Sequence, residues 1–190
     1  PQLASPSPEL LIAWILGQTT RIRVGSGGVM LQFYSPYKVA ENFNLLAALA
    51  PGRVDLGVGK APGGLPLSTR ALQLGLHPQE KGSFADQLTQ LDGWIHPEKQ
   101  SAEEAVRATP LPPVPAQLGA STESALLAAS LDWHFVFAAH LNGDPELLRE
   151  VVSTWRQNST RDVIVAVQAI VAESQEQADA LAQKVEVWGV

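Results

Sequence analysis

The sequence predicts an α/β fold in which strands and helices alternate and the strands form a parallel sheet. Three observations indicate this arrangement. Short apolar runs rich in Val and Ile recur along the 190 residues, segments with helical spacing of apolar residues follow them, and Gly or Pro separates the two. Strands that alternate with helices pair in parallel through helical crossovers. A repeat of roughly 30 residues suits either an open doubly wound sheet or a (β/α)8 barrel.

Two helices and two strands are expected at the start of the chain. In order, they are a mostly buried helix over residues 10–16, a buried strand over residues 21–31, a helix over residues 36–50 and a strand over residues 53–59. Ser7-Pro8-Glu9 and Ser35-Pro36 predict the two helix starts, because a Ser cap followed by Pro suits the first turn. Gly25-Ser26-Gly27-Gly28 interrupts the first strand, and glycines inside a strand usually mark a bulge or a close approach of another group.

The remaining elements follow a weaker stretch over residues 60–113, which Gly and Pro punctuate and in which helical segments are expected near residues 69–76 and 83–95. Alternation then resumes. The expected elements are a strand over residues 114–119, a helix over 123–130, a strand over 134–139, a helix started by Asp144-Pro145, a strand over 163–171 buried on both faces, and a helix opened by the capping box Ser174-Gln175-Glu176-Gln177.

Composition excludes several classes of protein. Thirteen Lys and Arg against nineteen Asp and Glu give a net charge of −6, which disfavours a nucleic-acid partner held by a general positive field. The chain has no Cys, so disulfides, thiolate metal sites and thiol catalysis are excluded. The apolar run over residues 10–16 is shorter than the roughly 18 residues of a membrane span, and no basic segment precedes it as in a signal peptide. We therefore expect a cytoplasmic protein with no membrane or nucleic-acid partner.

Candidate chemistry lies where strands end, because ligands of parallel α/β folds bind at the carboxyl ends of strands. Gly119-Ala120-Ser121-Thr122-Glu123-Ser124 joins a strand to a helix, and its free N–H groups, positive dipole end and hydroxyls suit a phosphate. A plain Ser or Thr cap is the alternative interpretation. Lys60 and Arg70 flank the loop after the second strand and would supply positive charge, unless they are solvated surface residues.

No catalytic or metal site is evident from motifs. The four His residues lack metal-ligand spacing, and only His140 follows a strand, so it is a weak catalytic candidate. Asp55 is expected inside a strand without an evident partner, and Trp14 and Trp155 are expected in the core or an interface. Gly-x-Gly-x-x-Gly, Walker and Gly-x-Ser-x-Gly motifs are absent, which weakens a nucleotide-binding or hydrolase interpretation.

Two blocks of sequence strongly resemble the bacterial luciferase-like flavin monooxygenases. One runs from Thr19 to Leu31 and continues through Tyr34-Ser35-Pro36-Tyr37-Lys38-Val39-Ala40-Glu41, and the other runs from Leu49 to Gly63. Weaker matches follow at residues 106–110 and 118–129. The resemblance implies a (β/α)8 TIM barrel, here as a single domain over residues 1–190, which uses reduced FMN, O2 and a small organic substrate.

The resemblance also implies site residues. The bulged strand with Ser26, Gly27 and Gly28 would lie against the flavin ring, often with a non-proline cis peptide. The residues that would hold the FMN phosphate are Lys60, Arg70, Gly119, Ala120, Ser121 and Ser124. Ala120 departs from the pattern, because many relatives have Ser there.

The first strands of the family, with its usual active-site histidine, would precede Pro1. We therefore expect a fragment or a reduced barrel with incomplete N-terminal strands, and little monooxygenase activity from these residues alone.

Three functions remain open at this point. The leading one is a flavin-dependent monooxygenase, supplied with reduced FMN by a separate flavin reductase. The others are a non-catalytic FMN-binding protein related to luciferase and an F420-dependent oxidoreductase of the same fold. The resemblance further implies a homodimer formed by the helices over residues 8–16 and 36–50, both of which are rich in apolar residues.

Overall fold

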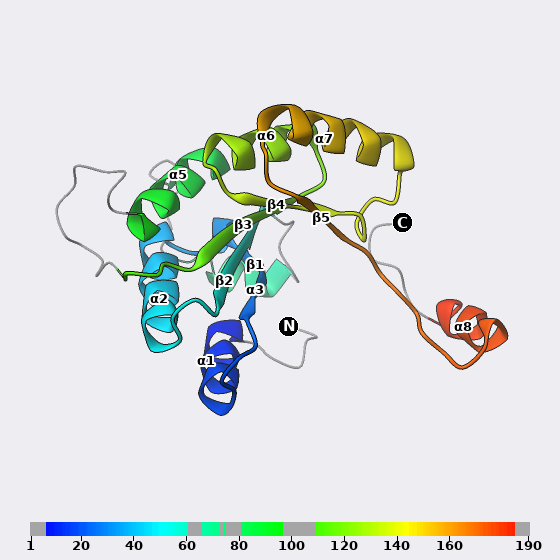
Figure 1. Ribbon diagram of the computed structural model, residues 1–190, viewed down its shortest axis with the longest axis horizontal. Helices are drawn as coiled ribbons and strands as arrows, with labels where there is room; N and C mark the ends of the chain where they lie inside the picture. Colours follow the sequence, from blue (N-terminus) through cyan, green and yellow to red (C-terminus); the bar gives the residue numbers. More distant parts are fainter. Residues whose placement is uncertain (1–6, 61–65, 73, 75–80, 97–108, 185–190) are drawn as a thin grey trace.

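Five parallel strands form the centre of the fold, which we describe from a computed structural model of residues 7–60, 66–72, 74, 81–96 and 109–184 (Figure 1). The strands are β1 (Val24–Met30), β2 (Val54–Gly59), β3 (Val114–Gly119), β4 (His134–Ala138) and β5 (Val163–Ala166). They lie in the sheet in chain order, and every neighbouring pair is parallel. The alternating α/β arrangement expected from the sequence is confirmed.

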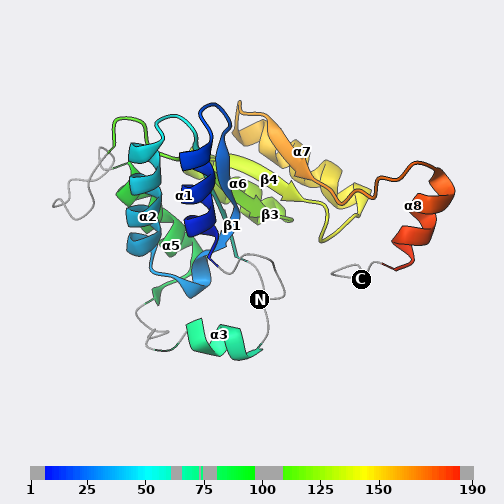
Figure 2. The ribbon, with the colours of Figure 1, turned by 90° about the horizontal axis from the view of Figure 1, so that it is seen from below.

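Helices gather along one face of this sheet. The described helices are α1 (Pro8–Gln18), α2 (Pro36–Leu49), α3 (Pro66–Leu72), α5 (Phe84–Ile95), α6 (Thr122–Ser130), α7 (Pro145–Asn158) and α8 (Gln175–Ala182), with a short 3-10 helix, η1, at Leu31–Phe33. Figures 1 and 2 show α2, α5, α6 and α7 following one another along the sheet, whereas α8 stands apart at the end of an extended segment.

The core lies between the sheet and these helices. Val54, Leu56 and Val58 alternate along β2 and are buried, and Phe135 of β4 shares their face through the register of β2, β3 and β4. The Phe135 ring lies 5.4 Å, centroid to centroid, from the buried ring of Trp155 on α7. Trp155 is therefore a core residue, as expected. Burial of side chains of this size stabilises the fold by roughly 1.5–3 kcal/mol each.

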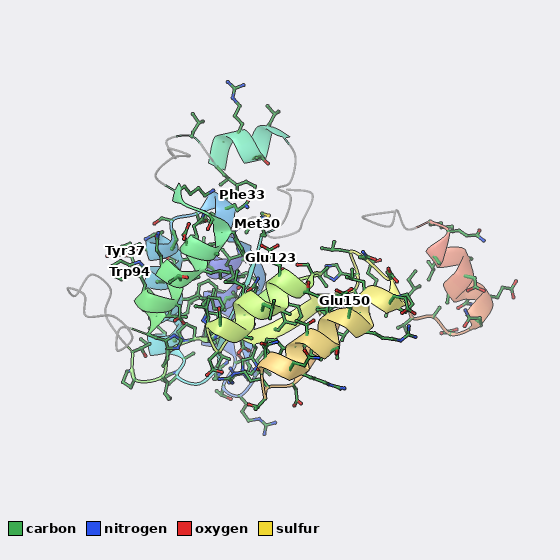
Figure 3. The ribbon with its side chains drawn as sticks, turned by 90° about the horizontal axis from the view of Figure 1, so that it is seen from above. Met30, Phe33, Tyr37, Trp94, Glu123 and Glu150 are labelled. Atoms are coloured by element: carbon green, nitrogen blue, oxygen red, sulfur yellow. The ribbon has the colours of Figure 1, made fainter. Side chains whose placement is uncertain are left out.

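Helices α2 and α5 also pack against each other. The Tyr37 and Trp94 rings meet edge to face at 5.4 Å (Figure 3), and Asn44 Nδ2 donates to the Trp94 carbonyl at 3.2 Å. Helix α5 begins at a full capping box, in which the Ser83 side chain accepts from the Asp86 N–H and the Asp86 carboxylate accepts from the Ser83 N–H. The contacts of Trp94 with Tyr37 and Asn44 hold α5 against α2.

The opposite face of the sheet carries a different set of residues. Asp55, Gly57 and Gly59 alternate with the buried residues of β2, so they face away from the helices. Ile164 of β5 belongs to this second face and is 51% exposed. On this side Asp55 and Gly59 are half-buried, whereas Gly57 is buried against Ser26 of β1.

The expectation of a mostly buried first helix is wrong. Of the residues in α1, Ile12 and Leu16 are buried, whereas Leu10 is 73% and Trp14 68% exposed. Helix α1 carries apolar residues on all of its sides, but only one side contacts β1 and α2. Apolar composition alone thus overestimates burial, and Trp14 is not a core residue of this chain.

Two strands are shorter than the sequence predicts. β1 begins at Val24 rather than at residue 21 and ends at Met30, because Leu31 turns into η1. β5 ends at Ala166 rather than at residue 171, and Ile164 and Val171 are exposed instead of buried on both faces. β5 pairs with β4 through Ala166, and the described ladder between them ends with the hydrogen bond from the His140 N–H to the Ala166 carbonyl.

Some expectations fall outside the described residues. The helix expected near residues 69–76 corresponds to α3, but its residues 73, 75 and 76 lie outside the described residues. The other expectations outside them concern His77, residues 61–63 and 106–108 of the resemblance, and Val185 of the last helix. Within the described part of the chain, no helix has the length and apolar character needed to cross a membrane.

A buried carboxylate connects α5 to the beginning of β4. Asp92 accepts from Trp133 Nε1 at 2.7 Å and is 2.9 Å from His96 Nδ1. Trp133 is fully buried and Asp92 is 6% exposed. A buried carboxylate is costly unless donors surround it, so this network holds the helix to the sheet at the amino ends of the strands.

We expect Asp92→Asn to lower the free energy of unfolding by about 1–1.5 kcal/mol, because the neutral amide oxygen of Asn accepts the hydrogen bond from Trp133 more weakly than a carboxylate oxygen does. Chemical denaturation measures this change. Asp162→Asn is the matched control, since Asp162 is exposed and no hydrogen bond of its carboxylate is seen within the described residues. Equal stabilities for the two variants would contradict the role assigned to Asp92.

Candidate functional site

A bulge in β1 shapes the backbone near the middle of this strand. The register between β1 and β2 shifts between Gly27 and Val29, so Gly28 is the extra residue, and the Gly27–Gly28 peptide is cis. A Cβ on Gly28 would lie 2.7 Å from the Gly57 carbonyl oxygen, whereas a Cβ on Gly27 would meet nothing within 4 Å. Gly28 is therefore held against β2, and Gly27 faces open space. The bulge lies where the sequence indicated.

Ser26 precedes these glycines and bonds to the neighbouring strand. Its hydroxyl donates to the Gly57 carbonyl at 2.8 Å, and its side chain is half-buried. Its single hydroxyl proton is thus used within the sheet.

The ends of β2 and β3 bring two of the expected residues together. Gly59 pairs with Leu118, so Lys60 follows β2 beside Gly119 at the end of β3. The Lys60 side chain is exposed. Gly119 packs closely on α6, because a Cβ there would lie 2.5 Å from the Ser124 side chain. A cation and a helix start therefore share one edge of the sheet.

The start of α6 is capped by two serines. Ser121 Oγ accepts from the Ser124 N–H at 3.2 Å, and the two hydroxyl oxygens are 3.0 Å apart. One hydroxyl proton lies between the two oxygens, which leaves the other available for a ligand. The N–H groups of Thr122 and Glu123 have no acceptor among the described residues, as is usual in a first turn. Ser121 therefore caps α6, and the start of this helix still has a hydroxyl proton and two N–H groups that can donate to a ligand.

Three further residues expected at the site are Ala120, His140 and Arg70, and not all of them lie at the carboxyl ends of the strands. Ala120 packs against the core and offers no donor from its side chain. His140 follows β4, where its N–H donates to the Ala166 carbonyl at 3.0 Å and extends the ladder to β5. Arg70 is exposed on α3, which Figures 2 and 3 show apart from the sheet. The structure does not bring Arg70 to the serines.

Asp55 has a partner that the sequence did not reveal. Its carboxylate accepts from Arg23 Nη2 at 2.5 Å and from Arg23 Nε at 3.2 Å. The hydrogen bond to Asp55 raises the pKa of the Arg23 guanidinium. Both side chains are more than a third exposed, so the pair adds little stability. Asp55 is a surface ion-pair residue near the amino ends of β1 and β2.

Tyr34 is a residue that the sequence reasoning did not single out. It follows η1 beyond the carboxyl end of β1 and is half-buried. Burial, and to a smaller degree the charge of Glu9, raises the pKa of its phenol. Tyr34 therefore stays a neutral hydroxyl at physiological pH. No local pattern marks it, because its burial depends on tertiary packing around η1, which contacts α5.

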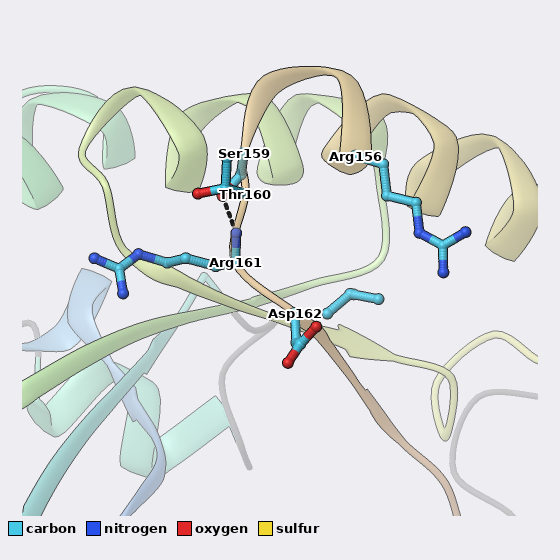
Figure 4. A pocket seen from close by; sticks show the side chains of 6 residues that line it. Arg156, Ser159, Thr160, Arg161 and Asp162 are labelled. Carbon is cyan, nitrogen blue, oxygen red and sulfur yellow. Dashed lines mark hydrogen bonds between the residues drawn. The ribbon is translucent and has the colours of Figure 1, made fainter.

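A hollow lies at the amino end of β5, and its polar side chains form hydrogen bonds within the fold. It is lined by Arg156, Ser159, Thr160, Arg161, Asp162 and Val163 (Figure 4). Arg161 donates to both Asp132 oxygens, at 2.9 and 2.8 Å, and its N–H donates to Ser159 Oγ at 3.2 Å. Arg161 is thus neutralised where α7 turns into β5. Among the described residues, no three His, Cys, Asp or Glu residues gather as a metal site would require.

Comparison with known proteins gives the family. Residues 1–189 match the model of the family described as luciferase-like monooxygenase. The chain belongs to this family. It is 46% identical over 154 residues to an N-acetyl-S-alkylcysteine monooxygenase of Bacillus subtilis, covering 78% of this chain and 46% of that protein. It is 35% identical over 167 residues to a luciferase-like monooxygenase of Escherichia coli, covering 82% of this chain and 46% of that protein. The chain thus spans about half the length of these relatives.

Solved structures share the fold. Apo-MsnO8 superposes with a TM-score of 0.75 at 37% identity, over 96% of this chain and 54% of that chain. The oxygenating constituent of 3,6-diketocamphane monooxygenase from Pseudomonas putida, solved in complex with FMN, gives 0.66 at 21% identity over 95% and 57%. A coenzyme F420-dependent tetrahydromethanopterin reductase from Methanopyrus kandleri gives 0.58 at 14% identity over 86% and 54%. The α/β fold with a parallel sheet is therefore that of luciferase-like proteins.

The two glycines of the bulge should respond differently to an added methyl group. We expect Gly28→Ala to lower the free energy of unfolding by about 1–3 kcal/mol, because its Cβ would collide with the Gly57 backbone. Gly27→Ala should change it by less than about 0.5 kcal/mol, because its Cβ has free space. Denaturant titration of both variants tests this difference, and equal destabilisation would show that the space at Gly27 is absent in solution.

Proposed function

We propose that this chain is part of a flavin-dependent monooxygenase that uses reduced FMN and O2 to oxygenate a small organic substrate. The observation that carries the proposal is the open backbone at Gly27, on a sheet whose neighbouring strands end in a capped helix start and a lysine. A flat ring can lie close to a backbone that has no side chain in the way. The family of the chain supports the same chemistry.

The spacing of the site suits a ligand with a ring at one end and a phosphate at the other. Gly27 pairs with Gly57, which pairs with Ala116, so two strand spacings of roughly 10 Å in total separate β1 from β3. Gly119 lies three residues beyond Ala116, or about 10 Å further along the strand. FMN, with its ring at Gly27 and its phosphate at α6, would follow this diagonal.

The phosphate would be held mainly by the backbone of α6. Free N–H groups of Thr122 and Glu123, the available proton of the Ser121–Ser124 pair and the positive end of the helix dipole all favour an anion. Lys60 adds a charge from the neighbouring strand. The exposed Glu123 carboxylate opposes binding, so we expect moderate rather than tight affinity for FMN.

Reduced FMN, when bound, would supply the electrons that activate O2. The chain's own residues would orient the ring against Gly27 and Gly28 and hold the phosphate at Ser121. His140, at the same edge of the sheet after β4, is the candidate for holding a proton near the substrate. A separate flavin reductase would provide the reduced cofactor.

We further propose that residues 1–190 form a single domain of a (β/α)8 barrel in which the second face of the sheet lines the interior. The relative named for N-acetyl-S-alkylcysteine suggests thioether amino acids as the first substrates to assay. Two alternatives keep the same site: an FMN-binding protein without activity, and an oxidoreductase that uses F420, as the reductase from Methanopyrus kandleri does according to its description.

Purification followed by a visible spectrum and mass analysis of the released cofactor separates these possibilities. FMN together with oxygenation of a thioether supports the monooxygenase. FMN without any oxygenated product is expected of residues 1–190 alone under both the monooxygenase and the binding-protein interpretation, so the full-length gene product separates these two, and F420 favours hydride transfer. A protein that neither retains nor binds any flavin would contradict the proposal.

We expect Ser121→Ala to weaken FMN binding about tenfold or more, because one charge-assisted hydrogen bond contributes roughly 1.5–3 kcal/mol. Titration of FMN fluorescence measures the change. Ser174→Ala is the matched control, since Ser174 caps α8 with the same 3.2 Å bond to a backbone N–H, far from the site in Figure 1. If both variants bind FMN like the parent chain, Ser121 does not donate to the phosphate.

We also propose a homodimer formed through α1 and α2. Leu10 and Trp14 on α1 and Leu45 and Leu49 on α2 are each more than 60% exposed, and α1 contacts α2. Exposed apolar side chains that gather on adjacent helices are typical of protein interfaces. The resemblance to luciferase-like proteins implies the same two helices as the dimer interface.

We expect the chain to sediment as a dimer. Trp14→Ser should raise the dissociation constant of this dimer at least tenfold, because buried aromatic residues dominate interface energies. Leu67→Ser on α3 is the control, since Leu67 is 82% exposed on a helix away from this surface. A parent chain that stays monomeric at all concentrations would contradict the dimer.

A further inference from the structure

Ser26 and Gly57 interlock where the register of the sheet changes. The Ser26 hydroxyl donates to the Gly57 carbonyl at 2.8 Å, and a Cβ on Gly57 would lie 2.1 Å from the Ser26 carbonyl oxygen. The same Gly57 carbonyl would be 2.7 Å from a Cβ on Gly28. Residues on both sides of Gly27 are thus in close contact with one peptide unit of β2.

Gly27 itself makes none of these contacts. It lies between Ser26 and Gly28, and a Cβ at this position would point into free space. Gly27 pairs with Gly57 in the ladder, but the close contacts that constrain the backbone here come from its two neighbours. Gly28 contributes a van der Waals contact, whereas Ser26 contributes the directional bond, because a hydrogen bond constrains both distance and angle.

We propose that Ser26 is a positioning residue, whose hydroxyl bond to the Gly57 carbonyl holds the backbone so that Gly27 is presented to the flavin ring. This inference rests on the proposed flavin site. The role differs from donating a hydrogen bond to the cofactor, because the only proton of the hydroxyl is already donated to β2. The bond crosses from one strand to the next, 31 residues away in sequence, at the place where the ladder is irregular.

The test compares FMN titrations of four variants with the parent chain. Ser26→Ala and Ser26→Val remove the hydroxyl, Ser26→Thr keeps it, and Ser130→Ala removes an unrelated hydroxyl-to-carbonyl bond at the end of α6. Thr and Val have the same shape, so their comparison isolates the hydroxyl even if the added methyl group disturbs the strand. We expect three- to tenfold weaker FMN binding for Ala and Val, and affinities within twofold of the parent for Ser26→Thr and Ser130→Ala.

A spectrum and a double-mutant cycle separate positioning from other roles. At saturating FMN, the absorbance band of the bound flavin should shift in Ser26→Ala, which a loss of stability alone would not cause. In a Gly27→Ala background, Ser26→Ala should weaken binding little further, because the presented surface is already altered. Additive effects would instead indicate a direct contact and overturn the inference.

The outcomes also distinguish this inference from the proposed function. A parent chain that binds FMN, with Ser26→Ala and Ser26→Val binding equally well, would overturn the positioning role and leave the flavin site intact. A parent chain that binds no FMN would overturn the proposed function, and the positioning role would fall with it.

Discussion

The two-residue alternation along β2 is the constraint on which the rest of the structure depends. Val54, Leu56 and Val58 must face the helices to be buried, so Asp55, Gly57 and Gly59 face the other side. A shift by one residue would exchange the two sets and expose the core, which strongly favours a single register. Because β2 lies between β1 and β3, its register also determines which residues of those strands meet at the candidate site.

The candidate site is built mainly from backbone. Gly57 and Gly28 allow β1 and β2 to approach more closely than larger residues would permit, and this contact leaves Gly27 with open space beside it. At the other end, α6 contributes its first N–H groups rather than a cluster of charged side chains. Ser26 and Ser121 each bond to backbone in this arrangement. The proposed site would bind a cofactor through few distinctive side chains, and a site of this kind needs no conventional catalytic motif.

Residues that stabilise the fold lie at the amino ends of the strands, whereas the candidate phosphate-binding residues lie at the carboxyl ends. The Asp92 network, the Arg23–Asp55 pair and the Arg161–Asp132 pair lie toward the amino ends of the strands, where they join helices or neighbouring strands to the sheet. The serine-capped start of α6 and Lys60 lie at the carboxyl ends. This division is the one expected for parallel α/β folds, in which loops at the carboxyl ends carry ligands and the other end carries stability. It supports the placement of the proposed flavin site.

Local patterns in the sequence determined the order of the strands and helices, the capping of α6 and α8 by serines, and the irregularity at Gly25-Ser26-Gly27-Gly28. These features depend on residues a few positions apart, so periodicity and turn chemistry suffice to predict them. The tertiary structure alone decided that Arg23 pairs with Asp55, that Ser26 bonds to Gly57, that Arg70 lies away from the serines, and that one side of α1 stays exposed. Each of these depends on how distant segments meet, and a contact between residues about 30 positions apart is fixed by strand register and packing, which no local pattern encodes.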